Sequence, residues 1–125
     1  DQALTAMSQG RVVILSGGTG NPLFTTDTAA CLRGIELRTD AVLKATNVDG
    51  VYSADPKKDP NATRYSQITF DQVLEQQLGV MDLTAMVLCR ENAMPIVVFD
   101  VSAEGALVAI SRGEDVGTRV ENVPV

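Results

Sequence analysis

Glycines and hydroxyl side chains follow an apolar stretch near the amino terminus, in an arrangement that could hold a phosphate group. The stretch 12–15 is continuously apolar and predicts a strand buried on both faces. Gly17, Gly18 and Gly20 then lie within four positions of one another. Because glycine adopts positive φ without strain, this backbone can turn sharply and expose its N–H groups to a ligand.

The expected start of a helix beyond these glycines strengthens the case for an anion site. Thr25, Thr26 and Asp27 lie where a helix beginning near Thr28 has its free amides and the positive end of its dipole. A tight connection between strand and helix would explain the glycines equally, and Asp27 could simply be an N-cap. The loop is neither a Walker A sequence, since no Gly-Lys-Ser/Thr follows, nor a G-x-G-x-x-G sequence.

The composition predicts one globular, soluble domain. The 125 residues are 45% hydrophobic and 21% charged, which is enough to form a core. A net charge of -6, with no basic block and few aromatic residues, argues against nucleic acid or a membrane surface as partner. No apolar run approaches the length of a membrane span, and the start lacks the features of a signal peptide, so we expect a cytoplasmic location.

Two further features concern the cysteines and the first residue. Cys31 and Cys89 lie in apolar surroundings without C-x-x-C spacing, and the chain has no histidine. We therefore expect two buried thiols, not a disulfide or a metal site. The chain opens on Asp1 instead of Met, part-way through an expected helix that ends at Gly10, so it could be cut from a longer protein.

The remaining pattern alternates helices with buried strands, which indicates an α/β fold with a largely parallel sheet covered on both faces. A segment rich in Asp, Asn, Pro and Gly, residues 46–62, predicts an ordered surface loop without regular structure. Ligands bind outside the carboxyl ends of strands in such sheets, so the loops after Leu15 and Ala45 are expected to line one cleft. Beyond the strand at 12–15, the expected elements are helices at 28–37, 70–78, 83–92 and 105–110, and strands at 41–45, 96–99 and 117–120.

Three motifs together give the chain a resemblance to a known family. They read S-G-G-T-G-N-P-L-F-T-T-D, K-A-T-N-V-D-G-V-Y-S-A-D-P-K-K-D-P and V-M-D-L-T-A, in this order and spacing. The chain from Gly10 to Glu121 thereby resembles the carboxyl-terminal half of bacterial uridylate (UMP) kinases, in the amino acid kinase superfamily. The resemblance implies that residues 1–125 are a single segment of a three-layer α/β/α sandwich. It also implies transfer of a phosphoryl group from ATP to UMP, giving UDP for pyrimidine nucleotide biosynthesis, with Mg²⁺ bound with the nucleotide, and assembly into a hexamer regulated by nucleotides.

The resemblance assigns the first motif to UMP. Thr19 and Asn21 suit the polar edge of uracil, and Thr26 suits the phosphate, because a nucleobase edge needs paired donors and acceptors and a dianion needs hydroxyl and amide donors. The implied UMP-binding set comprises Thr19, Gly20, Asn21, Pro22, Leu23, Phe24, Thr25 and Thr26.

The second and third motifs carry the implied ATP contacts and an active-site aspartate. Thr46, Tyr52 and Asp55 match ATP-contacting positions, although Tyr52 could be a half-buried loop aromatic and Asp55 a turn residue before proline. Asp82 matches the active-site aspartate, where a carboxylate orients lysines, amides or hydrated magnesium around the transferred group. Asp82 could also cap the following helix, and Lys44, inside a strand, is expected to form an internal ion pair.

Parts of the family pattern have no counterpart in these 125 residues. The Lys-x-Ser-Gly-Glu loop, a second glycine-rich loop, and an arginine and an aspartate that contact UMP all belong to the family's amino-terminal half. We therefore expect negligible kinase activity without that half. Two alternatives stay open: a nucleotide- or oxyanion-binding module without turnover, and a relative that phosphorylates carboxylates or carbamate.

Overall fold

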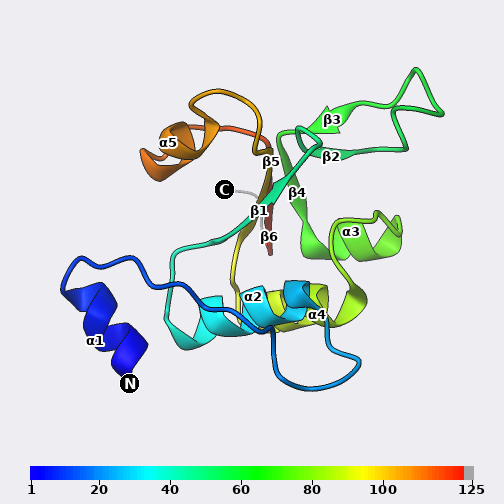
Figure 1. The fold of residues 1–125 in the computed structure, drawn as a ribbon. Coiled ribbons are helices and arrows are strands. Elements are labelled where there is room, and N and C mark those ends of the chain that lie inside the picture. The colour runs from blue at the N-terminus through cyan, green and yellow to red at the C-terminus, as the bar shows by residue number, and fades with distance from the viewer. Residues whose placement is uncertain (123–125) are drawn as a thin grey trace.

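The computed structural model describes residues 1–122, which form a four-stranded sheet with helices packed against it (Figure 1). The sheet has the order β1-β5-β6-β4, and a separate two-stranded hairpin is formed by β2 and β3. The helices are α1 (Gln2–Ser8), α2 (Thr26–Glu36), α3 (Phe70–Glu75), α4 (Leu83–Glu91) and α5 (Ala106–Ser111), and the strands are β1 (Val42–Thr46), β2 (Val51–Tyr52), β3 (Arg64–Tyr65), β4 (Gln67–Thr69), β5 (Ile96–Asp100) and β6 (Thr118–Glu121).

The sheet is mainly parallel, as the alternation of helices and strands predicts. β1 pairs with β5 and β4 with β6 in parallel, whereas β5 and β6 are antiparallel. β5 is central and buried from Ile96 to Phe99, as expected of a continuous apolar strand covered on both faces. Its Ile96 and Val98 belong to the main core, and Val97 lines a small hollow together with Ile110 of α5. In Figure 1, α5 lies on one side of the strands, and α3 and α4 lie on the other.

The main core is built where α2, α3 and α4 meet the sheet. Cys31 and Cys89 are both fully buried in it as free thiols, as expected. The hydrogen bond with the Cys89 thiol, and after it burial, raise the pKa of Cys31, so this thiol stays protonated at neutral pH. α3 begins with a capping box between Thr69 and Gln72, which fixes the direction in which the chain leaves β4.

Two expectations about the loop after β1 and the next helix were wrong. The segment 46–62 is not wholly irregular, because Val51 and Tyr52 form β2, which pairs antiparallel with β3. The helix that was expected to continue to Leu78 ends at Glu75, and the left-handed residue beyond it is Gln77, with φ of 53°. Strands of two residues are too short to show an alternating pattern, so the sequence gives little sign of this hairpin.

The strand that was expected at 12–15 is absent. Val12 and Ile14 are 93% and 89% exposed, and the segment pairs with no strand among residues 1–122. A similar exposure affects β1, which was expected to be buried: its Leu43 and Ala45 are exposed, and β1 lies at the edge of the sheet. The apolar sequence suits a covered strand, but no described element covers it, so these side chains face solvent.

Candidate functional site

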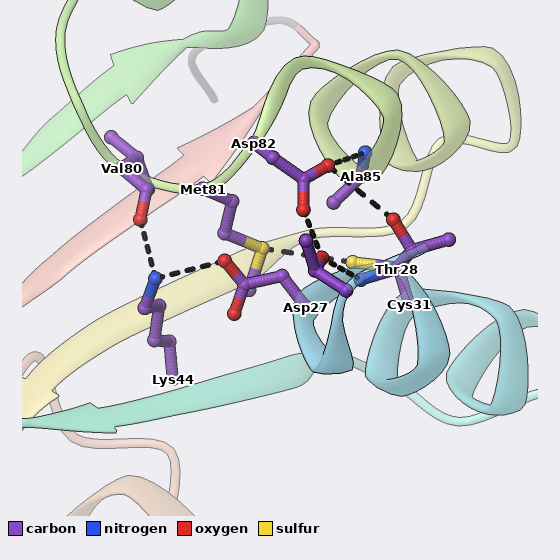
Figure 2. A network of polar contacts seen from close by, with 9 residues as sticks. Asp27, Thr28, Cys31, Lys44, Val80, Met81, Asp82 and Ala85 are labelled. Carbon is purple, nitrogen blue, oxygen red and sulfur yellow. Dashed lines mark hydrogen bonds and ion pairs between the residues drawn. The ribbon is translucent and has the colours of Figure 1, made fainter. Parts of the chain in front are cut away.

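Asp82 joins the end of the glycine loop to the start of α4. As the N-cap of α4, its carboxylate accepts from the backbone N–H of Ala85 at 2.9 Å. The same carboxylate accepts from the hydroxyl of Thr28 at 3.3 Å and from the hydroxyl of Thr25. Figure 2 shows this network between the amino-terminal ends of α2 and α4. The capping role therefore holds, and it places a negative charge directly beside the loop that was predicted to bind phosphate.

The surroundings of Asp82 keep it ionised. Partial burial favours the neutral acid, but the hydrogen bonds from Thr25, Ala85 and Thr28 and the charge of Lys44 outweigh that effect and hold the pKa of Asp82 below its usual value. At neutral pH the group is thus a fixed carboxylate that accepts hydrogen bonds, suited to orienting cations and donors and not to donating a proton.

Lys44 forms the internal ion pair expected of it. From β1, its ammonium donates to the carboxylate of Asp27 at 3.2 Å and to the carbonyl oxygen of Val80 at 2.7 Å (Figure 2). Asp27 lies in the first turn of α2 and is not its N-cap; that position belongs to Thr25, whose hydroxyl accepts from Thr28 N–H at 3.2 Å. The lysine therefore ties β1 to the chain just before Asp82.

The glycine loop has the backbone conformation that the sequence predicts. Gly17, Gly18 and Gly20 all have positive φ, between 65° and 89°, and Leu23 shares this conformation with φ of 72°. A hollow of about 840 Å³ separates the start of this loop from α2. Of the predicted UMP segment, only Thr26 is among the described residues that line it, and most of the rest of that segment is exposed beyond it.

Tyr52 and Asp55, two of the predicted ATP contacts, line a second hollow of about 540 Å³ together with residues 76–79. The phenol of Tyr52 donates to Asp49 at 2.8 Å, and this hydrogen bond raises the pKa of Tyr52. Asp55 accepts from the backbone N–H of Lys57 at 2.9 Å, so it also plays the turn role that was weighed for it. The exposed carboxylate and the half-buried ring lie at one opening.

Thr46 is not brought into this second hollow. It ends β1, its carbonyl oxygen accepts from Val101 N–H at 2.8 Å, and its hydroxyl contacts Asn47. Sequence reasoning missed two contributors: the segment 76–79, which forms the opposite wall, and Thr28, whose hydroxyl reaches Asp82. The apolar spacing after Thr28 predicted only that this residue begins a helix, and it gave no sign of a contact with Asp82.

The described residues offer no ready-made metal centre. Among residues 1–122, no three His, Cys, Asp or Glu side chains lie close enough together to hold a metal ion. The carboxylates of Asp27 and Asp82 carry the oxygen ligands that Mg²⁺ prefers, and such ions commonly arrive with phosphate groups.

None of the helices in this part of the chain has the length and apolar character needed to cross a membrane.

Comparison with known proteins supports the resemblance. A model of the amino acid kinase family matches residues 1–100. The uridylate kinase of Bacteroides thetaiotaomicron is 56% identical over 121 residues, covering 97% of this chain and 51% of that protein. The uridylate kinase of Saccharophagus degradans is 59% identical over 120 residues, covering 96% of this chain and 49% of that protein.

Solved structures give the same picture. The crystal structure of UMP kinase from Bacillus anthracis superimposes with a TM-score of 0.95 at 36% identity, covering 98% of this chain and 51% of that one. Aspartate kinase from Synechocystis superimposes with a TM-score of 0.74 at 25% identity, covering 21% of that chain. The chain thus spans about half the length of the curated relatives it matches.

Proposed function

This chain belongs to the amino acid kinase family, and from that premise we propose that it supplies the carboxyl-terminal half of a UMP kinase, which transfers a phosphoryl group from ATP to UMP. The observation that carries the proposal is the position of Asp82. Its carboxylate contacts Thr25, in the proposed UMP segment, and it lies three positions after Gly79, which lines the hollow proposed for ATP. Asp82 therefore contacts the proposed UMP segment and closely follows, along the chain, the residues that line the hollow proposed for ATP.

Each part of the site has a defined task in this proposal. The exposed loop 19–26 takes UMP, with hydroxyls and backbone amides around its phosphate at the start of α2. The ring of Tyr52 and the carboxylate of Asp55 take the nucleoside of ATP, since their hollow offers an aromatic face and a hydrogen-bond acceptor. Asp82 orients donors and cations around the transferred group, and phosphoryl transfer depends mainly on such positioning. Mg²⁺ carried by ATP would neutralise charge on the phosphates.

The remaining half of the kinase is an essential partner in this proposal. The exposed apolar segment 12–15 and the exposed face of β1 are the surfaces that the other half would cover. The phosphate-gripping lysine and glycines of the family have no counterpart here, so the 125 residues alone should show negligible turnover. A cytoplasmic location and a hexameric assembly are carried over from the resemblance as parts of the same proposal.

A chimera tests the function directly. The donor is the uridylate kinase of Saccharophagus degradans, because the part of it that matches this chain is 59% identical. Its amino-terminal half is joined to residues 1–125. We expect ATP-dependent formation of UDP from UMP, with little product from CMP, aspartate, acetylglutamate or carbamate. Tight binding of UMP without any product would favour a non-catalytic nucleotide-binding module and contradict the proposal.

The variant Asp82→Asn identifies the active-site carboxylate within the chimera. Asparagine caps helices about as well as aspartate, so the fold should be retained. Loss of the charge is expected to lower kcat about 100-fold, the usual scale for one preorganised electrostatic group. Asp71→Asn, which changes an exposed carboxylate in the first turn of α3, is the matched control and should leave kcat unchanged.

A further inference from the structure

Thr118 is a fully buried polar residue whose hydroxyl contacts both strands of the β2–β3 hairpin. It begins β6, and its Oγ1 accepts from the backbone N–H of Val51 at 2.8 Å and donates to the carbonyl oxygen of Tyr65. One hydroxyl can do both because it carries one proton and two lone pairs. Val51 and Tyr65 are directly paired in the hairpin, so the hydroxyl bonds the hairpin at a single rung.

The residues on either side of Thr118 continue this junction. The carbonyl oxygen of Gly117 accepts from the Arg64 guanidinium at 3.1 Å, and the backbone N–H of Arg119 donates to the carbonyl oxygen of Ser66 at 3.0 Å. Three successive residues, 117–119, thus bond the two residues of β3 and the residue that follows them. The contact between Thr118 and the Val51 N–H is buried, whereas that of Arg64 is exposed.

Gly50 shows how closely the hairpin approaches the sheet. A Cβ at this position would lie 2.5 Å from Oγ1 of Thr118 and 2.9 Å from Cδ of Arg64, so only glycine fits. Its backbone is not in the left-handed region, and the requirement is therefore one of space and not of conformation. Gly50 and Val51 also line the hollow that holds Tyr52 and Asp55.

We propose that Thr118 is the positioning residue that holds the β2–β3 hairpin against the sheet and thereby places Tyr52 and Asp55 for ATP; this rests on the proposed function. The opposite wall of the hollow, residues 76–79, follows α3 and is bonded to it through Leu78 N–H and the Val73 carbonyl oxygen at 3.0 Å, and the hydroxyl of Tyr65 in β3 donates to Oε1 of Gln76 in this wall at 3.1 Å. A displacement of the hairpin would therefore change the width of the hollow. Thr118 contacts neither the loop 19–26 nor Asp82 in the hydrogen bonds described, so its effect is expected on the ATP side alone.

Hydrogen exchange tests the structural half of this proposal without any nucleotide. In the 125-residue chain, Thr118→Val keeps the shape of the side chain but removes the acceptor of the buried Val51 N–H. Exchange at residues 50–55 and 63–66 is expected to accelerate about tenfold or more, with exchange in β5 unchanged. Thr118→Ser retains the hydroxyl and should keep exchange close to that of the original chain. Equal exchange in the hairpin of all three proteins would overturn the proposal.

Steady-state kinetics of the chimera test the functional half. Thr118→Val is expected to raise KM for ATP about tenfold while KM for UMP and kcat change less than about twofold, and Thr118→Ser should restore KM for ATP. A merely structural role would lower the amount of folded enzyme and leave both KM values alone, which would overturn the proposal. If Thr118→Val does not fold, Gly50→Ala disturbs the same junction from the hairpin side and is expected to give the same split.

The two failures are distinguishable. A parent chimera that forms no UDP contradicts the proposed function, and the exchange result then decides by itself whether Thr118 holds the hairpin. A parent chimera that is active, with a Thr118→Val variant that changes the KM values for ATP and UMP equally, leaves the proposed function standing and refutes the role of Thr118.

Discussion

The segment 10–24 and the core around β5 contain similar apolar residues but have opposite environments. Val12 and Ile14 are almost fully exposed, whereas Ile96 and Val98 are 0% and 4% exposed. Both stretches have the composition of a strand buried on both faces. What differs is the presence of neighbours: β5 has β1 on one side, β6 on the other and helices over both faces. An apolar sequence thus makes a strand suited to burial, but the strand is buried only where neighbouring strands and helices cover it.

The largest expected difference between the two regions is in stability. Ile96→Ala removes a fully buried side chain from the core and is expected to lower the free energy of unfolding by about 3 kcal/mol. Ile14→Ala makes the same change at an 89% exposed position and should alter that free energy by less than about 0.5 kcal/mol. Urea unfolding followed by circular dichroism measures both. Comparable losses for the two variants would mean that the segment 12–15 is packed in solution.

We expect this comparison to change in the chimera, which supplies the proposed other half. In the chain alone, the amides of residues 12–15 are expected to exchange almost as fast as in an unfolded peptide, because they lie in exposed irregular structure. In the chimera we expect these amides to become protected by about 100-fold or more, the protection typical of paired strands. Hydrogen exchange read by mass spectrometry measures this, with the amides of β5 as the internal control. Fast exchange at 12–15 in an active chimera would contradict the proposal that the other half covers this segment.

The sequence predicted the packed region well because its signals are local and complete. The apolar run at 96–99 and the caps Thr69 and Asp82 lie next to the structure that they specify. The strand at 12–15 and the burial of β1 were wrong for the opposite reason, since no element among residues 1–122 pairs with the segment 12–15 or covers Leu43 and Ala45 of β1. An apolar pattern indicates that a strand is suited to burial, but it does not indicate whether another element is present to cover that strand.

The local conformations at the candidate site were predictable from its residue types, but its long-range contacts were not. The glycines of the loop predicted positive φ, and the position of Asp82 before a helix predicted an N-cap; the structure has both. The hydrogen bond between Thr25 and Asp82 joins residues 57 positions apart, and the Thr118 hydroxyl reaches Val51 across 67 positions. Contacts at such separations follow from the order of strands in the sheet, which no local pattern encodes.

A smaller effect is expected at the ion pair between Lys44 of β1 and Asp27 of α2. Lys44→Met removes the ammonium that bonds Asp27 and the Val80 carbonyl oxygen but keeps an unbranched apolar stem. We expect the free energy of unfolding to fall by about 1 kcal/mol, since the pair is partly exposed and the carbonyl oxygen loses a donor. The control Lys57→Met changes a lysine in the exposed turn after Asp55 and should have no measurable effect. Equal stability of Lys44→Met and the original chain would show that the pair contributes nothing.

The smallest expected effect is the dependence of stability on pH that comes from Asp82. Because the folded pKa of Asp82 is lowered, its charge stabilises the fold above the unfolded pKa of about 3.9 and loses that contribution as pH falls through the folded value. Asp82→Asn keeps the cap but not the charge, so the original chain should be more stable than this variant near neutral pH. That advantage should shrink steadily below about pH 4 and vanish in stronger acid. Urea midpoints across this range, with the exposed Asp40→Asn as control, measure the difference. An advantage that grows on acidification would mean that folding raises the pKa of Asp82, and the carboxyl group would then not be the fixed negative charge that the proposed function requires.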